Sequence, residues 1–191
     1  MMSSLRIFTQ KLIVISFLLL LACAAQAAGQ TQIGFEQQVY PTGIIPGVRF
    51  ERSIGQRQAI HLRLGVQDID HEDFGVHDDE VGDGAGFTLG YSWFRNAGHQ
   101  GFSLGFRTDV WFNTLDWVDN PGQANEVSGT TDVTVLQPTV ELAYRYFFSG
   151  NRSYFLAPSL AAGFEINVDT DGEDVGEGFI VLGGIILGLS F

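Results

Sequence analysis

The strongest constraint on the fold of this chain is a period-two alternation of bulky apolar residues with small or polar ones. The segment 102–112 shows it best: FSLGFRTDVWF places Phe, Leu, Phe, Thr, Val and Phe at every second position, with Ser, Gly, Arg and Asp between the first five. The same period recurs at 61–67, 87–93, 140–146 and 156–166. Because successive side chains of a strand point to opposite faces, the pattern predicts β-strands that each have one apolar face.

Three more segments complete the set of predicted strands. A short strand is expected over 45–53, and a weaker one over 30–40, where the polar triplet 36–38 interrupts the alternation. The last, over 178–191, is almost wholly apolar. The sequence therefore predicts an all-β fold with eight strands. No run of 18 apolar residues follows residue 27, so a transmembrane helix is not expected.

The lengths of the links between these segments indicate how the strands are connected. Counted from the N-terminus, the odd-numbered links are long or intermediate and the even-numbered links are short. The long links are 69–85, 113–131 and 167–178, the intermediate one is 41–47, and the short ones are 53–58, 96–100 and 149–153. An up-and-down antiparallel barrel with both termini in the periplasm produces this pattern, because its periplasmic turns are short and its extracellular loops are longer.

The size of the side chains indicates which face of the barrel is apolar. An eight-stranded barrel has an interior just wide enough for side chains, so a full set of Phe, Leu, Tyr and Trp would overfill it. We therefore expect the bulky set to face lipid and the small or charged set to face inward, in contrast to a soluble barrel. Aromatic residues gather at the predicted periplasmic end and favour an interfacial girdle there: Tyr91, Trp93, Tyr144, Tyr146 and Phe191.

The N-terminus has the composition of an export signal. Residues 1–27 combine a charged start with Arg6 and Lys11, an apolar stretch from Leu12 to Ala22, and the small-x-small site Ala25-Gln26-Ala27. We expect cleavage after Ala27, which leaves 28–191 as one barrel domain. A lipoprotein signal ending at Cys23 is the alternative. Cys23 is the only cysteine, so the mature part has no thiol and no disulfide.

The whole segment after residue 27 resembles the small outer-membrane barrels of the OmpA, OmpX and OmpW type, without a periplasmic domain. The sharpest part of the resemblance is the C-terminus, where Ile185, Leu187, Leu189 and Phe191 stand at alternate positions and the chain ends in Phe. In that group such an ending is the signal that the barrel-assembly machinery reads. The resemblance implies a location in the outer membrane of a Gram-negative bacterium, in contact with its lipid and lipopolysaccharide.

Charged residues on the inward-facing positions form the first candidate site. Because alternate residues of a strand face the same side, we expect one set of charged side chains to point into the lumen and to form a network there. Its members are Glu36, Arg49, Glu51, Arg63, Arg107, Asp109, Glu141, Arg145 and Glu165. Buried charges persist when they are paired and hydrogen-bonded. The network is therefore interpreted as a plug that fixes the register of the strands, and a narrow polar channel is the alternative.

The acidic links form the second candidate site. Eight arginines stand against 22 acidic residues after residue 27, a formal net charge of −14, and 17 of those acids lie in the three long links or at their edges. A basic surface for nucleic acid is missing. The acids favour a solvated, repulsive surface, and divalent cations that bridge to lipopolysaccharide are the alternative. The weak metal-binding candidates are Asp70, His71, Glu72, Asp73, His77, Asp169 and Asp171.

Catalysis is the least favoured function. Some outer-membrane barrels modify lipid A with a histidine, a serine and an acid, but His61 is predicted in the lumen, His99 in a periplasmic turn, and His71 and His77 in an acidic loop. We expect no catalytic and no cofactor-binding residues. The sequence favours a non-enzymatic outer-membrane barrel that serves envelope integrity or surface interaction, with a narrow, porin-like pore as the alternative and a lipid-A-modifying enzyme after it. It does not indicate an oligomeric state.

Overall fold

A computed structural model describes residues 29–72 and 76–191, which form eight β-strands. The strands are β1 (Thr31–Tyr40), β2 (Gly43–Gly55), β3 (Gln58–Glu72), β4 (Asp79–Phe94), β5 (Gly101–Asp119), β6 (Val127–Phe147), β7 (Tyr154–Asp171) and β8 (Gly178–Ser190). Among the described residues, no helix is long and apolar enough to cross a membrane. The expected signal peptide, its cleavage site and Cys23 lie outside the described residues.

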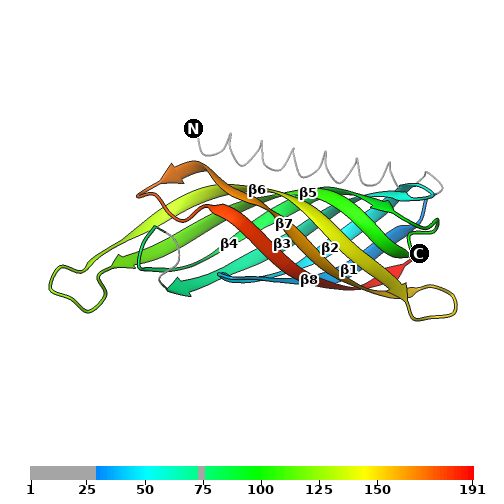
Figure 1. Ribbon diagram of the computed structural model, residues 1–191, viewed down its shortest axis with the longest axis horizontal. Coiled ribbons are helices and arrows are strands. Elements are labelled where there is room, and N and C mark those ends of the chain that lie inside the picture. The colour runs from blue at the N-terminus through cyan, green and yellow to red at the C-terminus, as the bar shows by residue number, and fades with distance from the viewer. Residues whose placement is uncertain (1–28, 73–75) are drawn as a thin grey trace, which may run out of the picture.

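The eight strands close into an antiparallel barrel in which each strand pairs with its neighbours in sequence (Figure 1). Closure joins β8 to β1, where Ile33 pairs with Leu189 and Phe35 with Leu187. At the same end the backbone groups of Thr31 and Phe191 exchange hydrogen bonds of 3.3 and 2.9 Å. A closed ring leaves no strand edge without a partner. The predicted eight-stranded up-and-down barrel is therefore confirmed.

The links are shorter and the strands longer than the sequence predicted. β5 has 19 residues and β6 has 21, whereas about 9–11 residues cross a bilayer. The expected long links 69–85 and 113–131 were wrong in extent, because their first residues still belong to strands. The backbone ladder continues to Glu72 in β3 and to Asp119 in β5. Likewise, β2 already begins at Gly43. Backbone pairing continues wherever a neighbouring strand offers partners, whether or not the side chains alternate in polarity.

The first strand keeps its alternation through the polar triplet that was expected to interrupt it. Glu36 and Gln38 point into the barrel and are buried, while Gln37 lies between them on the other face. The triplet is therefore one outward and two inward residues of a regular strand. The inward pair joins the polar interior described below.

The outer surface of the barrel is apolar on every strand. Each strand has large hydrophobic side chains that are about half exposed, for example Phe35, Val48, Leu64, Leu89, Phe106, Leu142, Leu160 and Leu187. Trp93, Tyr144, Tyr146 and Phe191 are exposed near the end that carries the short links, and the ring of Phe102 packs edge-on against Tyr144 at 4.8 Å. A continuous apolar exterior of this kind suits a hydrocarbon surrounding rather than water.

The interior is only partly polar. Charged side chains occupy its middle, but the part nearer the end with links 73–78, 120–126 and 172–177 is filled with buried apolar groups: Ile45, Ile69, Trp111, Leu115, Trp117, Val133, Val135, Ala161, Val175, Ile180 and Leu182. We call this set the inner apolar layer. The expectation that inward positions would be small or charged was wrong for this half of the barrel.

Inward-facing glycines explain how the large side chains of the inner apolar layer fit. A Cβ atom at Gly86 would lie 2.4 Å from Cε3 of Trp111, and one at Gly129 would lie 2.4 Å from Cζ2 of Trp117. Neither distance is possible for real atoms in contact, so the glycines provide the volume that the indole rings occupy. The narrow interior is thus filled by a large side chain on one strand that lies against a glycine on the neighbouring strand.

Candidate functional site

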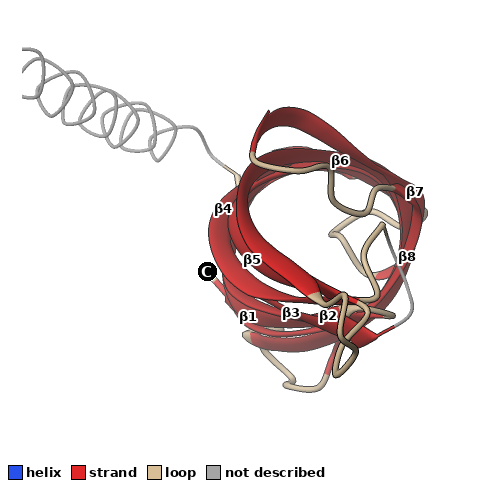
Figure 2. Ribbon diagram, turned by 90° about the vertical axis from the view of Figure 1, so that its left-hand side faces the viewer, coloured by secondary structure: helices blue, strands red, loops and turns tan. Residues whose placement is uncertain are grey.

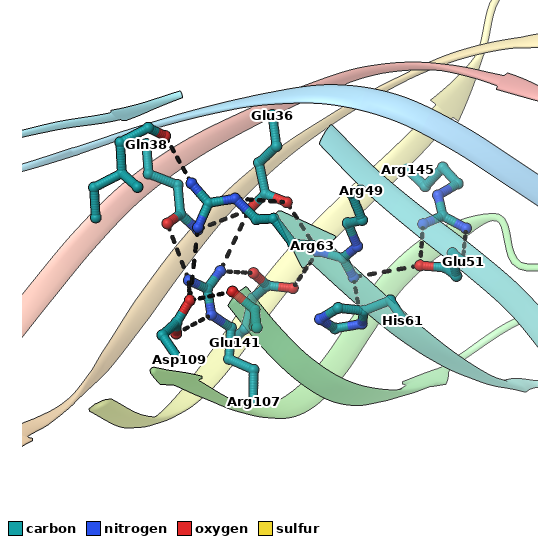
Figure 3. Close-up of polar contacts among 12 residues, drawn as sticks. Glu36, Gln38, Arg49, Glu51, His61, Arg63, Arg107, Asp109, Glu141 and Arg145 are labelled. Carbon is teal, nitrogen blue, oxygen red and sulfur yellow. Dashed lines mark hydrogen bonds and ion pairs between the residues drawn. The ribbon is translucent and has the colours of Figure 1, made fainter. Parts of the chain in front are cut away.

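Arg107 makes the most hydrogen bonds among the buried charges in the middle of the barrel (Figure 3). Its guanidinium donates to both carboxylate oxygens of Asp109 at 3.0 and 2.9 Å, to Glu36 at 3.3 Å and to Glu141 at 3.2 Å. It also donates to the amide oxygen of Gln38 at 3.0 Å. The strands β1, β5 and β6 are thereby connected through the lumen by one side chain.

Arg49 extends this cluster toward the end with the short links. Its Nη1 atom lies 3.3 Å from Glu141 and 3.6 Å from Glu36, and its Nη2 atom lies 3.3 Å from Glu51. Nη2 also lies 2.9 Å from Nδ1 of His61. Because a guanidinium only donates, Nδ1 of His61 is the acceptor, and the ring carries its proton on Nε2.

Two further arginines complete the network. Arg145 binds Glu51 through two hydrogen bonds of 2.7 and 3.0 Å, and its guanidinium lies 4.7 Å from the ring centres of both Phe94 and Phe155. Such a bidentate, ring-stacked arrangement is specific to arginine. Arg63 lies 3.6 Å from Asp109 and donates to a backbone carbonyl at 2.7 Å.

The network is electrically balanced and densely packed. Four arginines, Arg49, Arg63, Arg107 and Arg145, face four carboxylates, Glu36, Glu51, Asp109 and Glu141, and each is at most 4% exposed. The space bounded by Arg49, Glu51, Arg145 and Phe155 is too small to hold a water molecule. Chemically, this arrangement connects the strands across the lumen and occupies its cross-section.

Glu165 is not part of this network, in contrast to the prediction. Its carboxylate accepts a hydrogen bond of 2.6 Å from the amide of Gln137, and no arginine of the described chain forms an ion pair with it. Gln137 in turn accepts a 2.9 Å hydrogen bond from the indole of Trp111. Glu165 therefore belongs to the half of the interior that holds the inner apolar layer. The alternation of residues along the strand identified Glu165 as inward-facing, but it carried no information on the position of this side chain along the barrel axis.

The acidic end of the barrel is organised around His77, which joins three links. Its ring stacks on Trp117 at 4.0 Å, its Nδ1 lies 3.1 Å from a carboxylate oxygen of Asp119, and its Nε2 lies 3.0 Å from the carbonyl of Asp174. The carboxylate of Glu80 accepts the backbone N–H of His77 at 3.2 Å. Both ring nitrogens are therefore occupied by protein partners, and several of the acids bind backbone groups.

The other metal-binding candidates do not converge in the described chain. Asp70 and Glu72 lie on the exposed outer end of β3, while Asp169 and Asp171 lie on the exposed end of β7. Asp73 and the side chain of His71 lie outside the described residues. No three His, Cys, Asp or Glu side chains form a metal-binding group within 29–72 and 76–191. Cation binding at this surface stays a prediction.

One serine and histidine pair, which the sequence did not indicate, lies at the opposite end. Ser53 Oγ is 3.0 Å from Nδ1 of His99, and Nε2 of His99 is 3.1 Å from the carbonyl of Gly55. A carbonyl only accepts, so Nε2 carries the proton and the serine hydroxyl donates to Nδ1. Burial lowers the pKa of His99, which favours this neutral form. The pair joins the end of β2 to the β4–β5 turn.

The residues of the expected assembly signal all lie on the outer face of β8 or directly after it. Ile185, Leu187, Leu189 and Phe191 are 46%, 57%, 38% and 74% exposed. They lie at the strand that closes the barrel, next to β1. Their reading by an assembly machinery stays a prediction.

A closed eight-stranded antiparallel barrel with an apolar exterior and a charged interior defines the class of small outer-membrane β-barrels, and the chain has this fold. Among solved structures it is similar to Ail, the attachment invasion locus protein of Yersinia pestis, with a TM-score of 0.51 and 11% identity over 85% of this chain and 99% of that one. The structure of Ail in complex with the heparin analogue sucrose octasulfate has a TM-score of 0.50 and 12% identity, again over 85% of this chain and 99% of that one. The N-terminal β-barrel domain of Pseudomonas aeruginosa OprF has a TM-score of 0.43 and 13% identity, over 85% of this chain and 99% of that one.

These likenesses concern the fold alone. No protein-family model matches the sequence, and none of the curated proteins does. The expected resemblance to small outer-membrane barrels is confirmed at the level of the fold.

Proposed function

We propose that this protein is a non-enzymatic barrel of the Gram-negative outer membrane whose lumen is closed and whose function lies in envelope integrity or in contacts made by its acidic end. The observation that carries the proposal is the balanced ion-pair network of the lumen. Its eight charged side chains are buried, mutually paired and contributed by five strands, β1, β2, β3, β5 and β6. An interior arranged in this way supports the wall and leaves the ends of the barrel for interaction.

The location in the outer membrane is supported by the exterior. A ring of half-exposed Phe, Leu, Ile and Val side chains surrounds all eight strands, and lipid is the environment that such a surface favours. Because the termini and the short links share one end, we place that end in the periplasm. The acidic links then lie outside the cell.

A narrow pore is the alternative, and the packing of the network argues against it. Conduction needs a continuous polar path, yet the lumen contains a neutral, ion-paired layer in its middle and the inner apolar layer beyond it. Ions crossing both would lose hydration without a compensating site. The closed barrel is therefore preferred.

Single-channel conductance separates the two functions. The chain from residue 28 is refolded, its folding is verified by the mobility of an unboiled sample on a gel, and it is inserted into a planar bilayer. We expect no discrete openings. The matched variant Arg107→Ser with Glu141→Ser removes two facing side chains of opposite charge but leaves the inner apolar layer in place, so it is also expected to stay closed. Reproducible openings of the unaltered folded barrel would establish the pore and overturn the proposal.

The acidic end is the surface for which we propose an interaction role. Its carboxylates favour cationic partners and disfavour polyanions, so this chain differs in expected preference from the neighbour that was solved with sucrose octasulfate. Divalent cations that bridge the carboxylates to lipopolysaccharide fit this charge. Calorimetry with calcium at millimolar concentration tests that possibility, and the absence of heat would refute it.

A lipid-A-modifying activity has no comparable support. The serine and histidine that do meet, Ser53 and His99, lie at the end with the short links, and the second ring nitrogen of His99 contacts a carbonyl instead of an acid. This arrangement lacks the group that would stabilise the protonated ring during nucleophilic attack. Mass spectra of lipid A should be the same with and without expression of the protein.

A further inference from the structure

A cavity of about 100 Å³ lies in the interior near the acidic end of the barrel. It is bordered by the β1–β2 turn, by the link between β7 and β8, and by inward residues of β3 to β8. Figure 2 looks onto this end, where loop segments cross the mouth of the barrel. None of the ion-paired residues of the lumen network lines the cavity. It is therefore a separate feature of the fold.

The walls of the cavity are mainly aliphatic. Ile69, Leu115, Val133, Val135 and Ile180 line it, and each is at most 6% exposed. Val175, from the link between β7 and β8, also lines it and is 2% exposed. A carbon chain in this space would exchange water for apolar contacts on several sides.

The polar groups that line the same cavity include two hydrogen-bond acceptors without partners. Asn113 is 3% exposed; its amide nitrogen donates to Gln67 at 3.2 Å, and its Oδ1 atom has no partner. Asn167 donates to the carbonyl of Val175 at 3.0 Å, and its Oδ1 atom is likewise buried without a partner. A buried acceptor without a donor is unfavourable, so two of them at one cavity point to a missing donor.

Glu165 adds a carboxylate to these acceptors. Gln137 donates to one of its oxygens at 2.6 Å, and no described arginine pairs with it. By contrast, the four carboxylates of the lumen network all have arginine partners. The amide oxygen of Asn113 comes from β5, and the carboxylate of Glu165 and the amide oxygen of Asn167 come from β7, so the three acceptors belong to residues around one space. Together they favour a ligand that is cationic and rich in donors.

We propose that this cavity binds a primary ammonium group carried on a short aliphatic chain. Glu165 is the counter-ion, the amide oxygens of Asn113 and Asn167 accept N–H donors, and the aliphatic walls contact the carbon chain. An ammonium group has three donors and no acceptor, which matches the three acceptors of Asn113, Glu165 and Asn167. An apolar cavity of about 150 Å³ holds a benzene molecule, so this one suits a ligand of about five heavy atoms, such as n-butylammonium.

This inference goes beyond the proposed function and does not depend on it. A barrel that never conducts can bind a small amine at its acidic end, and a conducting barrel can do so as well. Failure of the amine to bind would leave the conductance experiment unaffected. The two proposals are therefore tested by independent measurements.

The test is an NMR titration of the folded barrel in detergent micelles with n-butylammonium chloride, read at the side-chain amides of Asn113 and Asn167. We expect saturable shifts at both amides. n-Butanol has nearly the same shape without the charge, and butyrate reverses the charge. Both are expected to bind at least about tenfold more weakly, because a charged hydrogen bond contributes about 1.5–3 kcal/mol.

Glu165→Gln keeps the shape of the side chain and removes its charge. It is expected to weaken binding of n-butylammonium at least about tenfold. The matched control is Asp132→Asn, which removes an exposed carboxylate on the outer face of neighbouring β6 and should change affinity less than about twofold. Equal binding of n-butanol, an unchanged affinity in Glu165→Gln, or no saturable shift because the cavity holds water only, would each overturn the proposal.

Discussion

Removal of Arg107 tests whether the lumen network stabilises the barrel. This side chain donates to Glu36, Gln38, Asp109 and Glu141 from a position that is 3% exposed. The substitution Arg107→Met keeps the length of the aliphatic stem but removes the guanidinium. It changes a balanced set of four positive and four negative groups into one with a net charge of −1, and each of the remaining charged side chains is at most 4% exposed.

The expected loss follows from this geometry. Breaking a buried ion pair by removing one partner costs about 3–5 kcal/mol, because the other charge stays buried without compensation. Asp109 retains Arg63 at 3.6 Å and Glu141 retains Arg49 at 3.3 Å, so part of the negative charge stays paired. We therefore expect the free energy of unfolding to fall by about 3 kcal/mol, near the lower end of that range.

Equilibrium unfolding by urea in lipid vesicles, followed by tryptophan fluorescence, measures this loss. Arg57→Met is the matched control, because Arg57 lies exposed in the β2–β3 turn, and its effect should stay within about 0.5 kcal/mol. Arg107→Met with Glu141→Gln restores neutrality and should recover about 1 kcal/mol or more. A loss below about 1 kcal/mol in Arg107→Met, close to that of the control, would refute the reasoning that the network carries stability.

Three other changes test separate parts of the molecule. Phe106→Arg places a charge on the outer apolar surface near the middle of its band, and unfolding in vesicles should show a loss of about 2–4 kcal/mol. His77→Ala removes the ring that contacts Trp117, Asp119 and the carbonyl of Asp174, so proteolysis of the acidic links should become faster while the barrel keeps its stability to within about 1 kcal/mol. Burial lowers the pKa of His99 below its ordinary value; its contribution to stability is therefore complete above about pH 6.5 and is lost as the pH falls through the lower folded-state value. His99→Gln should remove this acid-dependent part of the unfolding free energy.

Each of these tests has a specific contrary result. A neutral effect of Phe106→Arg would mean that the apolar exterior does not face lipid. Unchanged proteolysis in His77→Ala would mean that the three links are held together without the imidazole. If the free energy of unfolding falls equally at acid pH in His99→Gln and in the unaltered chain, the pH dependence arises from other groups.

The overall fold was predictable because the two faces of a barrel wall require different residue types at alternate positions of each strand. Residues such as Leu104, Phe106 and Val110 alternate with Gly105 and Arg107, and this period arises directly from the strand. The order of short and long links then indicates the up-and-down connection. These signals are local, and they need no knowledge of what a side chain contacts.

The extent of the strands and the depth of the inward residues were not predictable in this way. Beyond the apolar band the polarity of the two faces is reversed, because inward Leu115 and Trp117 alternate with outward Thr114 and Asp116. The pattern of apolar outward and polar inward residues therefore ends there, although the backbone ladder continues to Asp119. Parity likewise assigned Glu165 to the interior but not to a level along the barrel axis. Whether it meets Arg107 or Gln137 depends on the shear of the closed sheet, which arises only from the pairing of all eight strands.

The inner apolar layer shows why the volume argument worked for one half of the barrel and failed for the other. That argument took the capacity of the interior as uniform, but capacity depends on the neighbouring strands. Near the charged centre, Thr88 fills the space beside Asp109, and the ring of His61 takes the place where a Cβ atom of Gly90 would lie. Farther along, the indole of Trp111 takes the place where a Cβ atom of Gly86 would lie. An eight-stranded lumen is therefore filled by complementary pairs across adjacent strands. The aliphatic residues Val133 and Val135 border the cavity of about 100 Å³ near the acidic end, so that space lies among apolar walls and not within the ion-paired centre.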